Sequence, residues 1–365
     1  MILHLYFARR FAASFGVTLA VLFAMIFLVD LVDQTRRFAD RGANFGGLLK
    51  LTLLNAPETT NLVLPLIVLL ATVWGFVRLV RSSELIATRA AGRSGPVALT
   101  APAAVALLIG VLAVTVFNPI VAGTSKKYTE LAQSFRSGGA STLSISNEGL
   151  WLRQGTPEGQ MVIRAKRTTP DADVLFDVTL LAYDPEAGPN RRIQADSAEV
   201  RDGEWYLRNA KDWPLAEGEN AEANAKRSIS LTIPSTLTVE RIRESFGRPS
   251  NISIWNLPKY IRQLDQAGFS SLQHRVWFHA ELARPLFLVA MVLVASAFTM
   301  RQTRMRGTGI GVLTAVLLGF VLYFIRRFAL ILGENGQLPV LMAAWAPPLA
   351  SVLLALGPLL HAEEG

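Results

Sequence analysis

The sequence contains no cysteine and only four histidines, His4, His274, His279 and His361. The absence of cysteine excludes disulfides, iron–sulfur clusters and thiolate zinc sites. No two histidines form an HExxH pair, which argues against a zinc-protease site, and no GxxxxGK[ST] phosphate loop is present. We also find no convergent set of nucleophile, base and metal ligands. We therefore expect a chain that is not an enzyme, binds no cofactor of its own and does not hydrolyse ATP.

Charge is nearly absent from six long apolar stretches. They are Phe11–Val29, Thr59–Val77, Ser94–Ser125, Pro285–Met300, Gly307–Ile325 and Asn335–Leu360. A helix needs about 20 apolar residues to cross the hydrocarbon core. The fourth stretch reaches this length only by extending back through His279, Glu281 and Arg284. With 51% hydrophobic residues and a mean hydropathy of +0.34, the chain is predicted to be a polytopic membrane protein with six transmembrane helices.

The distribution of arginine predicts which side of the membrane each loop occupies. The net charge is +8, and nine arginines lie in short segments on one side: Arg9, Arg10, Arg78, Arg81, Arg89, Arg93, Arg301, Arg304 and Arg306. The positive-inside rule assigns these segments to the cytoplasm. The long polar block between the third and fourth helices then lies outside, which we interpret as the periplasm of a bacterium. The chain is expected in the inner membrane.

The polar block has the pattern of an all-β domain. Short alternating segments are Thr142–Ser146, Leu150–Arg153, Met161–Ala165, Val174–Ala182, Arg192–Ala198, Glu204–Leu207 and Ile229–Ile233. Turn residues separate them, which predicts an antiparallel sandwich or jelly roll. An amphipathic helix with Leu257, Tyr260, Ile261 and Leu264 on one face follows. The predicted domains are residues 1–125 (helices one to three), 126–250 (jelly roll), 251–275 (amphipathic helix and linker) and 276–365 (helices four to six). The β domain is either a spacer or a docking module or substrate slide with an open apolar interior.

The loop between helices two and three, Arg81–Gly92, has helical composition, an early acid and a terminal glycine. A short helix parallel to the membrane is how ABC permeases engage a separate ATPase subunit. In that interpretation residues 81–93 form a coupling helix, with ionic contacts from Arg81, Glu84 and Arg89 and apolar contacts from Leu85 and Ile86. The alternative is an ordinary charged loop that anchors two helices.

A second charged group lies at the outer end of helix one. Asp33 is three residues before Arg36 and four before Arg37, so both pairs can form on one helical face. The arginines either neutralise an interfacial helix end with Asp33 or form a phosphate-binding rim, because paired guanidinium groups bind phosphate bidentately. Arg326 and Arg327, at the outer end of helix five, would complete this rim if the two helices adjoin. Glu281 and Arg284 are expected to form a local salt bridge.

These motifs together resemble the LptF/LptG permeases of the lipopolysaccharide-export ABC transporter. Within that family the pattern Val32–Arg37 is more similar to LptG. The motifs that carry the resemblance, in order, are Leu5–Arg10, Arg81–Leu85, Glu148–Trp151, Pro258–Ile261, Arg284–Leu286, Gly336–Pro339 and Ala343–Pro347.

The resemblance implies a heterodimer with a paralogous LptF-like permease, a cytoplasmic LptB-like ATPase dimer that uses ATP and Mg²⁺, and a single-span LptC-like bridge protein. Lipopolysaccharide would enter from the outer leaflet between helix one of one subunit and helix five of the other, and pass to the jelly roll. Arg36 and Arg37 match basic positions that face the lipid A phosphates, and Glu84 matches the coupling acid. Asp30 and Glu281 stand where basic residues occur in some relatives. The alternatives are a non-transporting membrane scaffold that recruits partners, and an enzyme acting on lipid heads.

Overall fold

The computed structural model describes residues 2–38, 43–82, 84, 95–136, 144–146, 149–156, 159–169, 174–184, 188–201, 203–215, 220–235, 248–266, 270–300 and 308–364. The chain divides into two compact units. The first, which we call the helical unit, comprises Met1–Thr129, Ser250–Trp255 and Leu272–Gly365. The second, the sheet unit, comprises Glu130–Pro249 and Asn256–Ser271.

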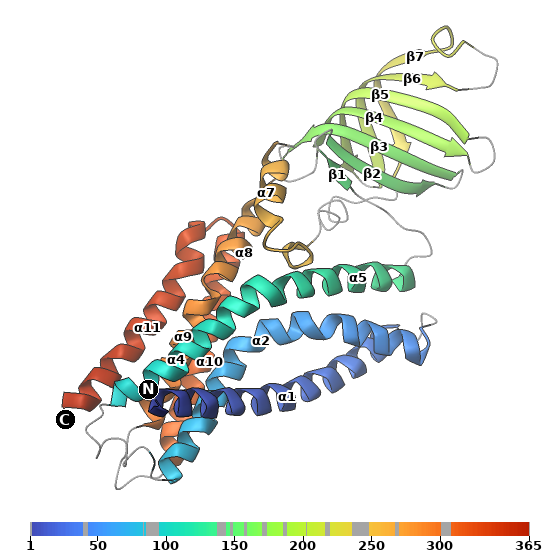
Figure 1. The fold of residues 1–365 in the computed structure, drawn as a ribbon. Coiled ribbons are helices and arrows are strands. Elements are labelled where there is room, and N and C mark those ends of the chain that lie inside the picture. The colour runs from blue at the N-terminus through green and yellow to red at the C-terminus, as the bar shows by residue number, and fades with distance from the viewer. Residues whose placement is uncertain are drawn as a thin grey trace. The chain divides into compact units, whose positions relative to one another are not determined.

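The long helices match the apolar stretches of the sequence (Figure 1). They are α1 (Ile2–Phe38), α2 (Phe45–Arg81), α4 (Gly95–Leu112), α5 (Asn118–Arg136), α8 (Leu272–Leu282), α9 (Arg284–Thr299), α10 (Thr308–Glu334) and α11 (Val340–Glu364). Among the described residues, five helical segments are long and apolar enough to span a membrane, and α8 with α9 gives a sixth if the bent pair is one span. The predicted fold class, a polytopic helical membrane protein with an inserted β domain, is confirmed.

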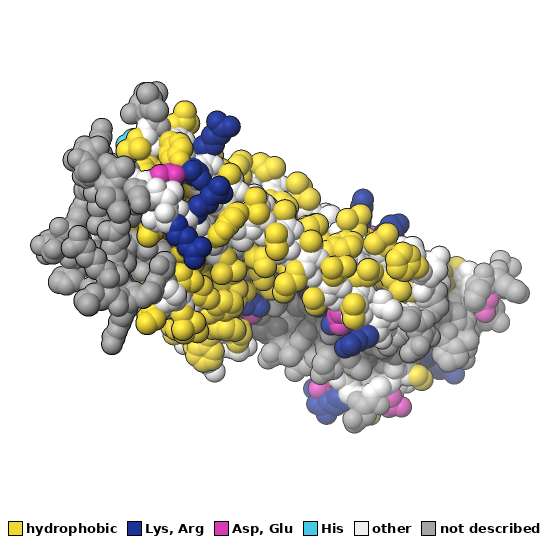
Figure 2. All heavy atoms as spheres, turned by 90° about the horizontal axis from the view of Figure 1, so that it is seen from below, with side chains coloured by type: hydrophobic (Ala, Val, Ile, Leu, Met, Phe, Trp, Pro, Cys, Tyr) yellow, Lys and Arg dark blue, Asp and Glu magenta, His cyan; other side chains and the backbone are white. Residues whose placement is uncertain are grey.

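Helix α9 forms the centre of the helical unit. It contacts α2, α4, α10 and α11, and its side chains from Phe287 to Ala295 are almost all buried. A helix that is apolar on every side has to be buried in protein or lipid. The outer helices instead expose large apolar side chains such as Val21, Phe324 and Phe328. Figure 2 shows hydrophobic side chains as a broad band on one face, with Lys and Arg side chains gathered beside it. Such a surface suits lipid rather than water.

The fourth predicted membrane helix, which comprises α8 and α9, is not continuous, in contrast to the single extended helix expected from the sequence. α8 ends at Leu282 and α9 begins at Arg284, and the two axes differ by 50°. Pro285 explains the break, because its ring has no N–H to donate to the fourth residue back and clashes with that carbonyl. The break places Glu281 and Arg284 at the corner between the two helices.

The third predicted membrane helix, which comprises α4 and α5, also departs from regular geometry. Five residues, Ala113–Phe117, form a π-helical turn between α4 and α5. The returning segment 250–255 is attached at this turn, where Trp255 Nε1 donates to the Thr115 carbonyl at 3.2 Å and the Ile254 amide donates to Asn118 Oδ1 at 2.9 Å. A π-turn leaves backbone groups without regular helical partners, and here one carbonyl accepts from a side chain.

Within the described residues, the sheet unit contains one seven-stranded antiparallel sheet in consecutive order (Figure 1). Its strands are β1 (Ser144–Ser146), β2 (Gly149–Thr156), β3 (Gly159–Thr168), β4 (Val174–Asp184), β5 (Gly188–Arg201), β6 (Glu204–Pro214) and β7 (Lys226–Pro234). Each predicted strand lies in or overlaps one of them. The described strands form a meander that curves around its own core, rather than a sheet with jelly-roll crossovers.

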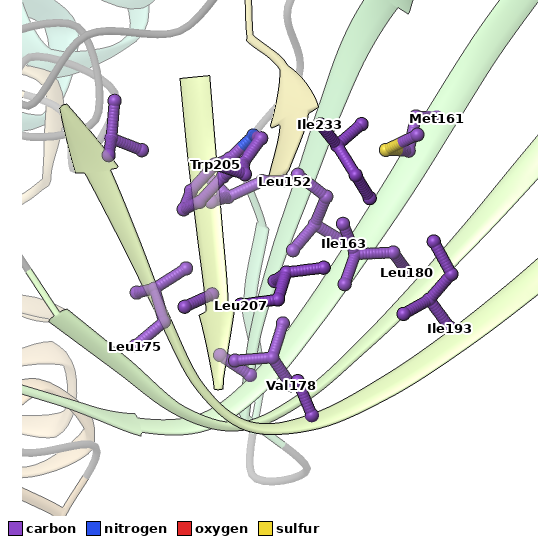
Figure 3. Close-up of a cluster of buried hydrophobic side chains, with 14 of the residues drawn as sticks. Leu152, Met161, Ile163, Leu175, Val178, Leu180, Ile193, Trp205, Leu207 and Ile233 are labelled. Atoms are coloured by element: carbon purple, nitrogen blue, oxygen red, sulfur yellow. The ribbon is translucent and has the colours of Figure 1, made fainter. Parts of the chain in front are cut away.

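The concave side of this sheet is filled by apolar side chains from β2 to β7. Figure 3 shows Ile163, Leu180, Ile193 and Leu207 directed toward one another there. Trp205 is fully buried, and its Nε1 donates to Gln154 Oε1 at 3.0 Å, which satisfies the indole N–H.

The amphipathic helix α7 (Leu257–Gln266) packs Leu264 and Tyr260 against this cluster, as its sequence pattern predicts. Burial raises the pKa of Tyr260 to about 12. The phenol is therefore neutral in the packed state.

Candidate functional site

Glu84, the predicted coupling acid, lies directly beside the first turns of α1. Tyr6 Oη donates to Glu84 Oε2 at 2.8 Å, and Arg10 Nη2 donates to Glu84 Oε1 at 2.9 Å. Arg10 Nε also donates to Tyr6 Oη at 2.9 Å. Three hydrogen bonds thus form a closed ring between the start of α1 and the segment that follows α2. The Glu84 side chain remains 26% exposed, so solvent or a partner can still reach it.

The other predicted coupling residues are placed less completely. Arg81 is the last residue of α2 and is exposed. Leu85, Ile86 and Arg89 lie outside the described residues. Of the predicted coupling helix over residues 81–93, the structure therefore describes only residues 81, 82 and 84.

A small cavity, to which Arg10 contributes, lies between α1, α2 and α4. Its volume is about 90 Å³, and its lining is mostly apolar: Phe7, Phe11, Trp74 and Pro102 together with Arg10 and Arg78. Two arginines from different helices thus meet at this end of the unit, as the arginine distribution in the sequence predicts. A cavity of this size has no room for a lipid.

At the opposite end of α1, Arg36 and Arg37 are both exposed. Arg37 Nη2 pairs with Asp33 Oδ2 at 2.9 Å across one helical turn, which is one of the two pairings that the spacing allows. Arg36 makes no ion pair with any described residue. Among the described residues, this end of α1 therefore presents one guanidinium group that is paired with a carboxylate and one that is not.

Asp30 lies two helical turns before Arg37 on α1 and is hydrogen-bonded to neighbouring side chains. Its Oδ1 accepts from Asn55 Nδ2 on α2 at 2.8 Å and from Gln34 Nε2 at 3.2 Å. Gln34 in turn donates to Tyr128 Oη on α5 at 3.1 Å. Asp30 thus joins three helices through a hydrogen-bonded chain, and the sequence alone did not reveal this role.

Arg326, which was predicted to complete the rim, lies inside the helical unit with only 6% of its surface exposed. Its Nη2 donates to the Ala280 carbonyl at 3.1 Å, and its guanidinium lies 5.0 Å from the centre of the Phe287 ring. Arg327 is half-buried. α1 packs on α2 and α4, whereas α10 packs on α2, α8, α9 and α11, so within this chain Arg326 is not brought to Arg36 and Arg37.

Glu281 and Arg284 form the local ion pair expected from their spacing, and both are buried. Arg284 Nη1 also donates to the Asn61 backbone carbonyl at 3.1 Å and contacts the side-chain oxygen of the same residue. The pair thus attaches the α8–α9 corner to α2. Asn61 and Arg326 also belong to this cluster, and the sequence analysis missed this because both come from other helices, far from Glu281 and Arg284 in the sequence.

The concave side of the sheet is occupied by its own side chains in this structure, as described above. An additional groove of about 470 Å³ crosses β4 to β7 and is polar, with Asp177, Asp196, Asn209 and Arg227 among its lining residues. Asn209 Nδ2 donates to Asp196 Oδ2 across it at 2.8 Å. Within the described part of the chain no group of three or more His, Asp or Glu side chains is arranged to hold a metal ion.

Tyr6 and Arg10 are the functional candidates that sequence reasoning passed over. The sequence analysis named both within a motif and counted Arg10 among the cytoplasmic arginines, but it did not use their i,i+4 spacing, which places them on one helical face. Their contact with Glu84 joins residues far apart in the sequence, so no local pattern reveals it.

Comparison with known proteins gives a consistent result. The family model described as lipopolysaccharide export system permease LptF/LptG matches residues 5–361. The lipopolysaccharide export system permease protein LptG of Haemophilus influenzae is 24% identical over 358 residues, which cover 96% of this chain and 95% of the relative. The protein of the same description from Escherichia coli K12 is 23% identical over 366 residues, with 97% of each chain covered.

Proposed function

The chain belongs to the lipopolysaccharide export system permease LptF/LptG family, and we propose on this basis that it is the LptG-like membrane subunit of a lipopolysaccharide exporter. The observation that carries the proposal is the match over residues 5–361, which includes the helical segments and the inserted sheet. The full-length similarity to two LptG proteins favours LptG over LptF. The protein would be a multi-pass inner-membrane subunit with its sheet unit in the periplasm.

In this proposal Glu84 couples the chain to an LptB-like ATPase dimer, which binds ATP and Mg²⁺. An acid that is held by two side chains and still partly exposed suits a docking contact with a cationic partner residue. Arg81 and Arg89 would add ionic contacts, and Leu85 and Ile86 apolar ones. The missing phosphate loop supports the assignment of ATP hydrolysis to that partner.

The lipid would be recognised at the outer end of α1. Arg36 and Arg37 offer exposed guanidinium groups for lipid phosphates, and Asp33, which pairs with Arg37, would compete with the phosphates for it. Arg327, half-buried on α10, is proposed as a further member of this rim across the interface with an LptF-like subunit. Arg326 would support it by holding α10 against α8.

Extraction of this substrate needs an external energy source. Removing an acyl chain from lipid exposes apolar surface at about 0.8 kcal/mol per methylene group. A subunit without its own nucleotide site therefore has to receive work from an ATPase. An LptC-like bridge protein would then receive the lipid from the sheet unit or from its periplasmic neighbours.

The decisive experiment is co-expression with candidate LptF-like and LptB-like subunits, comparing wild type with Glu84→Gln. We expect a co-purifying complex whose ATPase activity is stimulated by lipopolysaccharide, and we expect the amide to lower this stimulation or release the ATPase because it removes the docking charge. A matched control is Glu130→Gln, a carboxylate on α5 to which no coupling role is assigned.

The alternative is a scaffold that recruits partners without transporting lipid. A chain that purifies alone, is stable and is indifferent to Glu84→Gln would support the scaffold and remove the transport proposal.

A further inference from the structure

The first turns of α1 contain two side chains, Tyr6 and Arg10, that contact Glu84 and to which the proposed docking assigns no role of their own. Tyr6 and Arg10 are separated by one helical turn, and the Arg10 guanidinium lies 5.4 Å from the centre of the Tyr6 ring. The side chains of Tyr6 and Arg10 thus pack on each other as well as contacting Glu84. This mutual support removes rotamer freedom that a single exposed arginine would keep.

The ring of hydrogen bonds fixes both oxygens of the Glu84 carboxylate. One oxygen accepts from Tyr6 and the other from Arg10, while Arg10 Nε donates to the Tyr6 hydroxyl. A carboxylate held at both oxygens has a defined orientation, which a carboxylate in an ordinary charged loop lacks. Hydrogen bonds to charged groups are also stronger than neutral ones.

We propose that Tyr6 and Arg10 are positioning residues for Glu84, and that their contact links the coupling segment directly to α1. The inference rests on the proposed function of Glu84 and extends it. Glu84 would receive the movement of the partner ATPase, and the ring would transmit it to α1 rather than only to α2 and α4, which flank the segment in sequence.

Helix α1 is suited to carry such a movement over its whole length. It runs from Ile2 to Phe38 as one unbroken α-helix without proline, whereas α2 contains Pro57 and Pro65. At 1.5 Å per residue, Arg10 and Arg36 are about 40 Å apart along the axis. One rigid helix would thus connect the coupling acid at one end with the exposed arginines of the proposed lipid rim at the other.

The test uses the complete complex reconstituted with lipopolysaccharide in vesicles of bacterial phospholipid. The readout is the ratio of lipid-stimulated to basal ATPase rate, with subunit stoichiometry measured on the same samples. Arg10→Gln and Tyr6→Phe are expected to lower this ratio by about two- to fivefold, the effect of losing one ion pair or hydrogen bond at a partly exposed site. Arg10→Lys should recover part of the loss, and Arg9→Gln, which removes a neighbouring exposed charge, should leave the ratio unchanged.

Combination with Glu84→Gln distinguishes positioning from an independent role. If Tyr6 and Arg10 act through Glu84, adding Arg10→Gln to Glu84→Gln lowers the ratio no further than Glu84→Gln alone. If the two effects multiply, or if Arg10→Gln behaves as Arg9→Gln does, the positioning inference is wrong while the coupling role of Glu84 stands.

If instead Glu84→Gln retains the full ratio in an intact complex, the proposed function of Glu84 fails and the inference falls with it. Tyr6→Phe removes only one hydroxyl group and keeps the ring. It therefore tests the positioning role even if Arg10→Gln prevents assembly of the complex.

Discussion

The two arginines at the outer end of α1 differ in what each side chain already contacts. Arg37 is paired with Asp33 at 2.9 Å, whereas Arg36 has no ion-pair partner among the described residues. A phosphate that approaches Arg37 has to compete with the Asp33 carboxylate. The cost of this competition predicts a rank order for the effects of substitution.

We expect Arg36→Gln to weaken lipopolysaccharide binding by the complex more than Arg37→Gln, by about two- to fivefold for the larger effect. Asp33→Asn should strengthen binding, because it releases Arg37 and removes a negative charge from the rim. Binding of labelled lipopolysaccharide to the purified complex, measured at two salt concentrations, provides the test, with Arg9→Gln as the control at the other end of the helix. Equal losses for Arg36 and Arg37, or no effect of Asp33→Asn, would contradict this order.

Single residues also show where sequence reasoning reaches its limit. The Glu281–Arg284 pair follows from a three-residue spacing, and the structure confirms it. The burial of Arg326 does not follow from its neighbours in sequence, because Arg327 next to it suggests an exposed basic end. Only the packing of α10 on α8 and α9 brings the Arg326 guanidinium to the Ala280 carbonyl and the Phe287 ring.

At the scale of elements, periodicity identified the strands and helices but not their irregularities. The alternation in the polar block predicted each of the seven described strands, since a half-buried strand has to alternate along its length. The break at Ala283 and the π-turn at Ala113–Phe117 were missed. Pro285 provided a local signal for the break, whereas the contacts of the π-turn are with the distant segment 250–255.

The close approach of α4 to the start of α9 depends on Gly110. A Cβ atom added at this position would lie 2.4 Å from the Pro285 Cα atom, a backbone atom that cannot move aside cheaply. We expect Gly110→Ala to lower the free energy of unfolding by about 1–3 kcal/mol, as overpacking of a filled core does. Gly123→Ala on α5 is the matched control, because an added Cβ there meets nothing within 4 Å.

Thermal unfolding of the detergent-solubilised chain measures both variants under one condition. A loss of stability in Gly110→Ala alone is the expected result. It would show that the contact between α4 and α9 stabilises the corner between α8 and α9. If Gly123→Ala is as destabilising as Gly110→Ala, the effect reflects glycine replacement in a membrane helix rather than the contact with Pro285.

At the scale of the whole molecule, the absence of cysteine makes the topology directly testable. Any cysteine introduced is the only thiol in the chain, so its reaction with a membrane-impermeant maleimide reports the side on which it lies. Three exposed positions cover both predicted sides: Ile229 on β7, 87% exposed, Lys50 near the start of α2, and Ser82 just after its end. Ser82→Cys exchanges one small side chain for another and disturbs the nearby Glu84 ring little.

We expect the cysteines of Ile229→Cys and Lys50→Cys to be labelled in cells with an intact inner membrane, and that of Ser82→Cys only after this membrane is permeabilised. The arginines beside Ser82 assign that end of α2 to the cytoplasm. The length of α2, 37 residues, then carries the chain across the bilayer to Lys50 with residues to spare. Labelling of Ser82→Cys in intact cells would show that the orientation of the chain is the reverse of the predicted one. The docking of a cytoplasmic ATPase at Glu84, two residues further along, would then be impossible, whatever the family of the chain.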